Sequence, residues 1–144
     1  MIGSPSLRLA TEADTAELAR LLSHLGYPTP VDAVAAVWEA WTAEGNFAVV
    51  AQGERSLLGV ITLHRMVVLH RPQAVGRITS LVVEPSARGQ GLGRALILAA
   101  EEALTSAGCG LLEVTSHARF ADAHGFYMHL GFEQTSSRFG KVLS

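Results

Sequence analysis

Cysteine is nearly absent from the sequence, and long apolar runs are missing altogether. The one cysteine, Cys109, excludes an internal disulfide and a cysteine-rich metal site. No apolar stretch approaches the roughly 18 residues that span a bilayer, and the N-terminal MIGSPSLRLA lacks the apolar core of a signal peptide. We therefore expect a cytoplasmic protein that does not bind a membrane.

Charged side chains are also few. They make up 17% of the chain, against 49% hydrophobic residues, and the formal net charge is -2. This balance is typical of a globular protein and provides no basic face for nucleic acid. His117, His124 and His129 share no helical spacing and lack a supporting cluster of acids, so we expect no metal site. The 144 residues have the size of one domain, which we expect to span residues 1–144.

Hydrophobic periodicity and turn residues divide the first half of the chain into short elements. Thr11, followed by two acidic residues, predicts the start of a helix that runs to about Leu25. Trp38 and Trp41 fall on the apolar stripe of a second helix, and we expect them to pack on the core. The other predicted elements are a strand at 7–10, that second helix at 31–44, a hairpin of strands at 46–52 and 57–70, and a strand at 76–85.

The second half of the chain reads as a strand, helix, strand unit followed by a last helix. Apolar residues recur at helical spacing after Gly91, and GLLEVTSH at 110–117 predicts the next strand. Two strands joined by one helix are most simply parallel, with a right-handed crossover. The last helix contains Tyr127 and ends at Gly131, and the tail SRFGKVL at 137–143 predicts a final strand. The fold class is therefore a mixed α/β sheet.

The segment ARGQGLGRAL at 87–96 places three glycines within five positions, with an arginine on each side. Such a cluster indicates a sharp bend or a close approach to the backbone, because glycine interrupts both strands and helices. A tight turn accounts for one or two of the glycines. Free amides at the start of a helix near Gly91, together with Arg88 and Arg94, favour a bound phosphate or pyrophosphate.

Two common phosphate-binding loops do not fit this segment. A nucleoside triphosphate loop needs a lysine followed by Ser or Thr after its last glycine, and here Arg94 and Ala95 follow Gly93. A dinucleotide loop needs its third glycine where Arg94 stands, although Glu113, twenty residues beyond Gly93, imitates the acid that binds ribose. A dinucleotide fold also needs a second half-sheet, for which the chain is too short.

One combination of motifs resembles the GNAT superfamily of acyl-coenzyme A-dependent N-acetyltransferases. It consists of LVVEP (81–85), RGQGLG (88–93) and AHGFYMHLGF (123–132). The resemblance covers residues 76–132, whereas the first 70 residues fit only by their pattern of elements. It implies a mixed sheet of six or seven strands whose two central parallel strands splay apart to admit coenzyme A (CoA), with acetyl-CoA as the acyl donor.

The resemblance also implies which residues bind CoA. In the family, the amides of the glycine loop surround the pyrophosphate, and the end of the preceding strand pairs with the pantetheine arm. The loop residues are Arg88, Gly89, Gln90, Gly91, Leu92 and Gly93, with Arg94 close by, and the strand residues are Leu81, Val82 and Val83. The family's frequent asparagine seven residues before the tyrosine of the last motif is replaced by Phe120.

The same resemblance assigns the catalytic roles. Tyr127 maps to the general acid that protonates the departing thiolate, and the alternative is a tyrosine packed in the core. An alkylammonium must lose a proton before it can attack, so a base is needed as well. Glu84 and Glu113, which lie on the two splayed strands, are the candidates, and a water relay is the alternative.

The function that the resemblance implies is acetyl transfer from acetyl-CoA to a primary amine of a small molecule, by direct attack in a ternary complex. A protein N-terminus or lysine is the alternative acceptor, and a longer acyl group is the alternative donor. A CoA-binding domain that has lost catalysis is the non-enzymatic alternative. The sequence leaves the oligomeric state open, a homodimer included.

Overall fold

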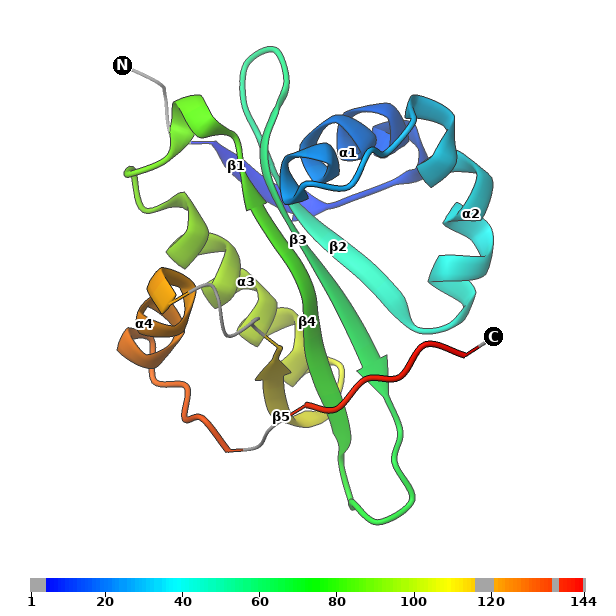
Figure 1. Cartoon of the computed structure of the whole chain (residues 1–144), viewed down its shortest axis with the longest axis vertical. Helices are drawn as coiled ribbons and strands as arrows, with labels where there is room; N and C mark the ends of the chain where they lie inside the picture. Colours follow the sequence, from blue (N-terminus) through cyan, green and yellow to red (C-terminus); the bar gives the residue numbers. More distant parts are fainter. Residues whose placement is uncertain (1–4, 116–120, 136–137, 144) are drawn as a thin grey trace.

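The computed structural model describes residues 5–115, 121–135 and 138–143. Five strands form one sheet in the order β1-β2-β3-β4-β5 (Figure 1). The pairs β1–β2, β2–β3 and β3–β4 are antiparallel, and β5 runs parallel to β4. The strands are β1 (Ser6–Leu9), β2 (Asn46–Gln52), β3 (Leu57–Met66), β4 (Ala74–Val83) and β5 (Cys109–Val114). The predicted mixed sheet with a late parallel pair is therefore confirmed.

The described sheet has fewer strands than the six or seven expected, because the tail adds none. For the described tail residues 138–143 the prediction of a strand is wrong. Phe139, Val142 and Leu143 are exposed by 91%, 93% and 88%. These side chains gain no burial, and burial against neighbouring side chains is what stabilises a strand in a sheet.

The helices divide between the two faces of the sheet (Figure 1). On strand β2, Ala48 and Val50 pack in the core beneath α1 and α2, whereas Val49 and Ala51 pack in the core with α3 and α4. This follows from the alternation of side chains along a strand. Within the described ranges, every helix falls short of the length and apolarity that a bilayer crossing requires. The helices are α1 (Thr15–Leu22), α2 (Val31–Ala43), α3 (Leu92–Ser106) and α4 (Ala121–His129).

The N-terminal strand is tied to the start of α1 by one carboxylate. Asp14 accepts two hydrogen bonds of 2.8 Å from the Arg8 guanidinium and one of 2.8 Å from the Thr11 backbone amide. The predicted helix start at Thr11 is a single 3-10 turn, Glu12–Asp14, and the α-helix follows from Thr15. Hydrogen bonding to Arg8 lowers the pKa of the Asp14 carboxyl below its ordinary value.

Strands β4 and β5 separate before β4 ends. Their parallel pairing runs from Ala74 with Cys109 to Ile78 with Val114, where β5 stops. Strand β4 continues to Val83, still paired with β3 on its other side. Among the described residues, no strand pairs with the β5 side of β4 beyond Ile78. The predicted splaying of the two parallel strands begins there.

A bulge in β4 lies at the same place. Thr62 of β3 pairs with Ser80, and the next residue, Leu63, pairs with Ile78, so Thr79 is the extra residue. The Thr62 hydroxyl then lies 2.7 Å from the Thr79 hydroxyl and also contacts the Ser80 hydroxyl. The bulge therefore brings two consecutive hydroxyls of β4 to one side chain of β3.

Asp14→Asn should lower the free energy of unfolding at neutral pH by about 2 kcal/mol, because it removes the charged acceptor of three hydrogen bonds. The folded pKa of Asp14 is lowered, so its contribution is present above the pKa of the unfolded chain and is lost as pH falls through the folded pKa. Urea unfolding at neutral and acidic pH measures both effects. Glu12→Gln, at an exposed position in the same turn, is the control. Equal losses in the two variants would contradict the assignment.

Candidate active site

Two of the three glycines in the loop before α3 are required by the backbone. Gly89 and Gly91 have φ angles of +79° and +78°, a region that L side chains rarely adopt. Nothing lies within 4 Å of the position that a Cβ would take at either glycine. Gly93 differs, because a Cβ there would lie 3.5 Å from the Phe126 ring of α4. The loop is thus bent sharply and open on one side, and α4 packs against its far end.

The backbone amides at the start of α3 have no partners in the part of the chain that the structure describes. The first hydrogen bond of the helix runs from the Ala95 amide to the Gly91 carbonyl, at 3.1 Å. Within the described ranges, no protein group accepts from the amides of residues 89–94. Arg88 and Arg94 are exposed beside them. Free amides, the positive end of a helix dipole and two guanidinium groups together favour an anion.

The free edge of β4 offers backbone groups next to this loop. The Glu84 amide donates to the Leu58 carbonyl of β3 at 2.8 Å. Because alternate residues of an antiparallel strand turn to the same neighbour, Val82 also turns to β3, and Leu81 and Val83 turn to the free edge. The Val83 carbonyl accepts a 3.2 Å hydrogen bond from Arg88 Nε. Of the three predicted strand residues, Leu81 and Val83 therefore bring backbone groups to the edge, and Val82 does not.

Tyr127 is held in place by the end of α4. The Gly131 amide bonds to the Met128 carbonyl and the Phe132 amide to the Tyr127 carbonyl, both at 3.1 Å, and Gly131 has a φ angle of +92°. Helix α4 ends at His129, and Gly131 makes the turn that stops it, as predicted. The Phe132 ring lies edge-on to the Tyr127 ring, with 5.5 Å between their centroids. The Phe126 ring also packs against the Tyr127 ring, with 5.4 Å between the two centroids.

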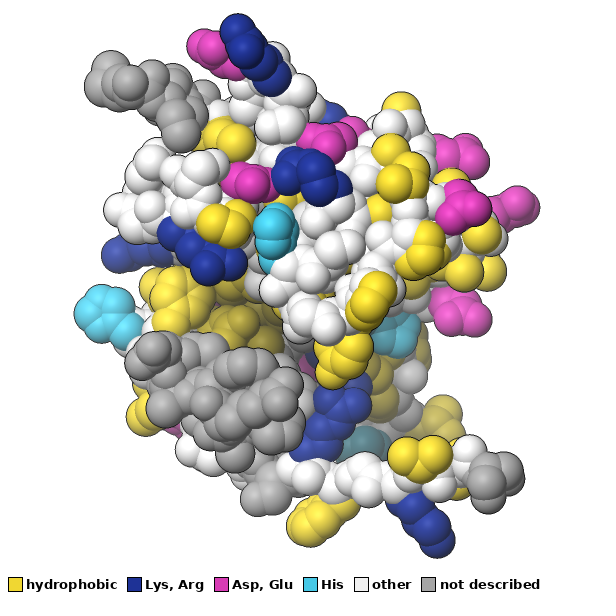
Figure 2. Space-filling model, turned by 45° about the horizontal axis from the view of Figure 1, so that its top comes forward, with side chains coloured by type: hydrophobic (Ala, Val, Ile, Leu, Met, Phe, Trp, Pro, Cys, Tyr) yellow, Lys and Arg dark blue, Asp and Glu magenta, His cyan; other side chains and the backbone are white. Residues whose placement is uncertain are grey.

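The surroundings of Tyr127 combine burial with a cavity. Burial raises the pKa of the Tyr127 phenol above its ordinary value. Tyr127 and Glu113 both line a cavity of about 650 Å³ along β5 and the end of α4. Figure 2 shows one face of the molecule, with a hollow whose floor carries hydrophobic side chains. Phe120 lies outside the described residues.

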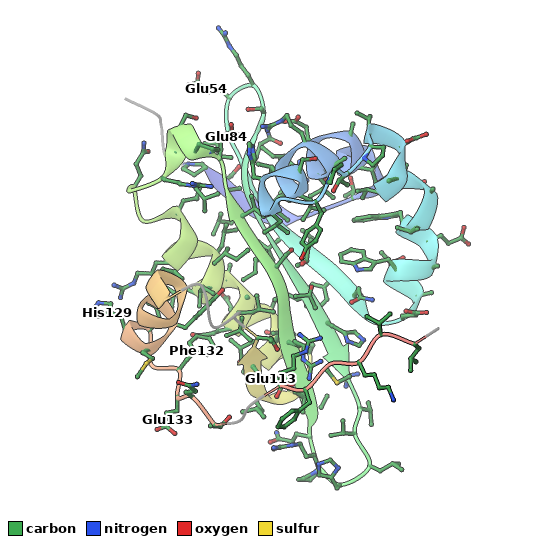
Figure 3. All side chains as sticks on the ribbon, in the orientation of Figure 1. Glu54, Glu84, Glu113, His129, Phe132 and Glu133 are labelled. Atoms are coloured by element: carbon green, nitrogen blue, oxygen red, sulfur yellow. The ribbon has the colours of Figure 1, made fainter. Side chains whose placement is uncertain are left out.

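The two candidate bases lie far apart and are both paired with arginines. Glu84 forms an ion pair with Arg20 of α1, whereas Glu113 accepts a 3.0 Å hydrogen bond from Arg77 Nε of β4. In Figure 3, Glu84 lies near α1 at one end of the sheet and Glu113 at the other end, on the side of Phe132 and Glu133. The structure therefore brings Glu113 and Tyr127 to one cavity and leaves Glu84 apart.

Metal-binding groups do not gather in the described part of the chain. No three His, Cys, Asp or Glu side chains there come close enough to hold a metal ion. His129 lies on the outer side of α4 (Figure 3). His117 and the side chain of His124 lie outside the described residues.

A second cavity, of about 190 Å³, lies between α1, α2 and the sheet, and no pattern in the sequence predicts it. Trp38 and Trp41 line it, together with Thr62 and Ser80. Both tryptophans pack against the core beneath α1 and α2, as predicted, but they are only half-buried. The apolar stripe of α2 predicts that these residues face the sheet, but a stripe does not distinguish a core layer from a cavity wall. The β4 bulge that contributes the hydroxyls has no mark in the sequence.

Comparisons with known proteins agree with this geometry. The model of the acetyltransferase (GNAT) family matches residues 13–132. The aminoglycoside N(6')-acetyltransferase type 1 of Stenotrophomonas maltophilia is 34% identical over 140 residues, which cover 94% of this chain and 91% of that protein. The aminoalkylphosphonate N-acetyltransferase of Salmonella typhimurium is 40% identical over 87 residues, 60% of this chain. This chain spans only 56% of the length of the Salmonella protein.

Solved structures are similar over nearly the whole chain. An acetyltransferase from Trypanosoma brucei has a TM-score of 0.85 and 29% identity, covering 96% of this chain and 99% of that one. An aminoglycoside N-acetyltransferase in complex with CoA also has a TM-score of 0.85, covering 98% of this chain and 96% of that one. Its identity is 21%, so this likeness shows the fold alone.

Gly91→Val should abolish the thermal protection that CoA gives, because the added side chain would enter the open space beside the free amides. Positive-φ strain should cost the variant about 1–3 kcal/mol of stability. Gly108→Val is the matched control, because Gly108 follows the other end of α3 with a φ angle of +86° and an equally open surrounding. Thermal unfolding with and without CoA measures the effect. Full protection in Gly91→Val would show that the loop does not hold the anion.

Proposed function

Because the chain belongs to the acetyltransferase (GNAT) family, we propose that it transfers the acetyl group of acetyl-CoA to a primary amine of a small molecule. The observation that carries the proposal is the meeting of three features at one place. These are the amides of residues 89–94 and the edge of β4, both without partners among the described residues, and α4 with Tyr127 packed against the loop through Phe126. Together they offer anion-binding groups, an extended backbone edge and a proton donor.

The two relatives support a small-molecule acceptor. Their names describe acetyl transfer to aminoalkylphosphonates and to aminoglycosides, both of which are small amines. A formal net charge of -2 and the absence of an acidic stripe in the sequence give no reason to prefer a polycationic protein tail. A protein N-terminus or lysine is the second candidate acceptor.

The residues that would hold CoA divide by the group that they recognise. We propose that the amides of Gly89, Gln90, Gly91, Leu92 and Gly93 bind the pyrophosphate, with Arg88 and Arg94 adding charge. Leu92 would act through its backbone, since its side chain is buried in the core. Leu81 and Val83 would pair with the pantetheine arm as a neighbouring strand does, and Val82 would contribute only its packing. The open space at Gly89 and Gly91 fits such a ligand.

The chemistry requires one proton to be delivered and another to be removed. Acetyl-CoA supplies an acetyl group activated as a thioester, whose C–S bond breaks as the C–N bond to the amine forms. We propose that the Tyr127 hydroxyl, which is protonated at neutral pH, donates its proton to the leaving sulfur as the C–S bond breaks. The phenolate then recovers a proton from solvent. The nitrogen loses its surplus proton to a base, and direct transfer in a ternary complex needs no covalent intermediate on the protein.

Glu113 is the better placed of the two candidate bases. It shares a cavity with Tyr127, and its pairing with Arg77 orients its carboxylate. Glu84 is bound to Arg20, which also bonds to Glu17 at 2.8 Å and to the Leu57 carbonyl at 2.9 Å. That network serves to join α1 to β3 and β4. We therefore place the base at Glu113, with Glu84 and a water relay as the alternatives.

Release of CoA thiol from acetyl-CoA on addition of a panel of primary amines tests the proposed activity. The panel includes an aminoglycoside, aminoethylphosphonate, simple alkylamines and a lysine peptide. We expect amine-dependent release with small molecules. Binding of CoA without release for any amine would instead support a domain that has lost catalysis.

Tyr127→Phe should lower turnover by about ten- to a thousandfold, because it removes the proton donor and keeps the ring. CoA affinity and the melting temperature should change little, since the contacts of the ring with Phe126 and Phe132 are retained. The only other tyrosine, Tyr27, is 71% exposed, so Tyr27→Phe is the matched control. Steady-state kinetics measure both variants. Near-normal turnover in Tyr127→Phe would assign this residue to packing alone.

Glu113→Gln should lower the rate by about a hundredfold, and the remaining pH dependence should follow ionisation of the amine alone. Glu84→Gln should leave the pH profile unchanged, although it loses the ion pair with Arg20. Profiles of kcat/KM against pH for both variants measure this. If the pH profile changes in Glu84→Gln alone, Glu84 is the base. If the pH profile changes in neither variant, a water relay removes the proton.

A further inference from the structure

The cavity between α1, α2 and the sheet has an apolar end and a polar end. Its apolar end is lined by Leu18 and Leu22 of α1 and by Trp38 and Trp41 of α2. At its polar end lie Thr62 and Ser80, whose hydroxyls contact each other at the β4 bulge. None of the eight side chains that line the cavity is charged.

Helix α2 forms one wall of this cavity and contributes no buried side chain to the core. None of its thirteen residues is buried, although the helix is rich in apolar side chains. Trp38 and Trp41 contact each other, with 5.1 Å between ring centroids and a tilt of 39°. Their faces are therefore partly open to the cavity, where a flat apolar group would find two aromatic surfaces.

The polar end of the cavity lies where β4 leaves β5. Ser80 directly follows the bulge residue Thr79 and precedes Leu81, whose backbone groups turn to the free edge. The Thr79 side chain is exposed, and its hydroxyl lies 2.7 Å from that of Thr62. Three hydroxyls thus stand between the apolar cavity and the edge to which the pantetheine arm is assigned.

We propose that this cavity holds the body of the amine acceptor, and that the acceptor is a primary amine carrying one uncharged aromatic or similarly sized apolar group. This inference rests on the proposed function and names its substrate class. The ring lies against Trp38 and Trp41, and the amino nitrogen reaches the hydroxyls of Thr62, Thr79 and Ser80. These hydroxyls accept hydrogen bonds from the nitrogen and orient it toward the free edge of β4.

Size and charge both favour such an acceptor. An apolar cavity of about 150 Å³ is large enough to bind benzene, and this cavity measures about 190 Å³. An aminoglycoside with several ammonium groups, or a phosphonate, would bring charges to a lining that has no counter-charge, and an unpaired charge is costly to bury. The acceptor class therefore differs from those in the names of the two relatives.

Intrinsic fluorescence tests binding without catalysis. The chain has two tryptophans, and both line the cavity, so tryptophan emission reports on this site. Titration with phenethylamine should change the emission with saturation, and ethylamine, which lacks the ring, should give no saturable change over the same range. Absence of a saturable response to phenethylamine, with and without CoA, would overturn the proposal.

Kinetics with the same amines test selectivity. Wild-type kcat/KM should be higher for phenethylamine than for ethylamine, aminoethylphosphonate or an aminoglycoside. Trp38→Ala should lower kcat/KM for phenethylamine by about ten- to a hundredfold and change that for ethylamine by less than about threefold. Val31→Ala is the control, because Val31 lies on the same helix, is 68% exposed and does not line the cavity. Trp38→Leu, which keeps an apolar side chain, repeats the test if Trp38→Ala does not fold.

The outcomes separate this inference from the proposed activity. Thiol release with an aminoglycoside or aminoethylphosphonate, but not with phenethylamine, would overturn the cavity assignment and leave acetyl transfer intact. Equal losses for phenethylamine and ethylamine in Trp38→Ala would also overturn it, because a purely structural role does not discriminate between amines. Failure of every amine to release thiol would refute the proposed activity, and the fluorescence titration would still decide whether the cavity binds the ring.

Discussion

Strand β4 continues past the point where its parallel partner ends, and the placement of the site depends on this mismatch. Backbone amides and carbonyls need hydrogen-bond partners when they are removed from water. At residues 79–83 the described chain leaves one side of β4 unpaired, and the glycine loop that follows adds the free amides of residues 89–94. A ligand with an extended amide-containing arm and an anionic group can satisfy both sets.

The other features of the site are arranged around that edge. Gly93 lets the Phe126 ring approach the start of α3, and the cap at Gly131 then fixes Tyr127 beside Phe126 and Phe132. The bulge at Thr79 brings the Thr79 hydroxyl to that of Thr62, next to the point where β4 separates from β5. In the proposed function, the acyl donor approaches β4 from its edge and the acceptor from its α1 and α2 face.

Much of this arrangement could be predicted from the sequence because its signals are local. Each of these features depends on a few neighbouring residues. They are the three glycines between a strand and a helix, the crossover between β4 and β5, and the turn at Gly131 that stops α4. The ion pair of Arg20 with Glu84 joins residues 64 positions apart, and no local pattern indicates it. Likewise, the bulge at Thr79 results from the register between β3 and β4, and the half-burial of Trp38 and Trp41 depends on how α2 sits on the sheet.

Amide hydrogen exchange with and without CoA tests the central claim most directly, because it observes the unpaired backbone groups themselves. If the edge of β4 and the loop hold CoA, exchange should slow at the amides of Leu81 and Val83 and of residues 89–94. The amides of Val82 and Glu84, which turn to β3, should show little change, as should Gly108 at the other end of α3. Protection of Val82 and Glu84 equal to that of Leu81 and Val83, or no protection of residues 89–94, would contradict the claim.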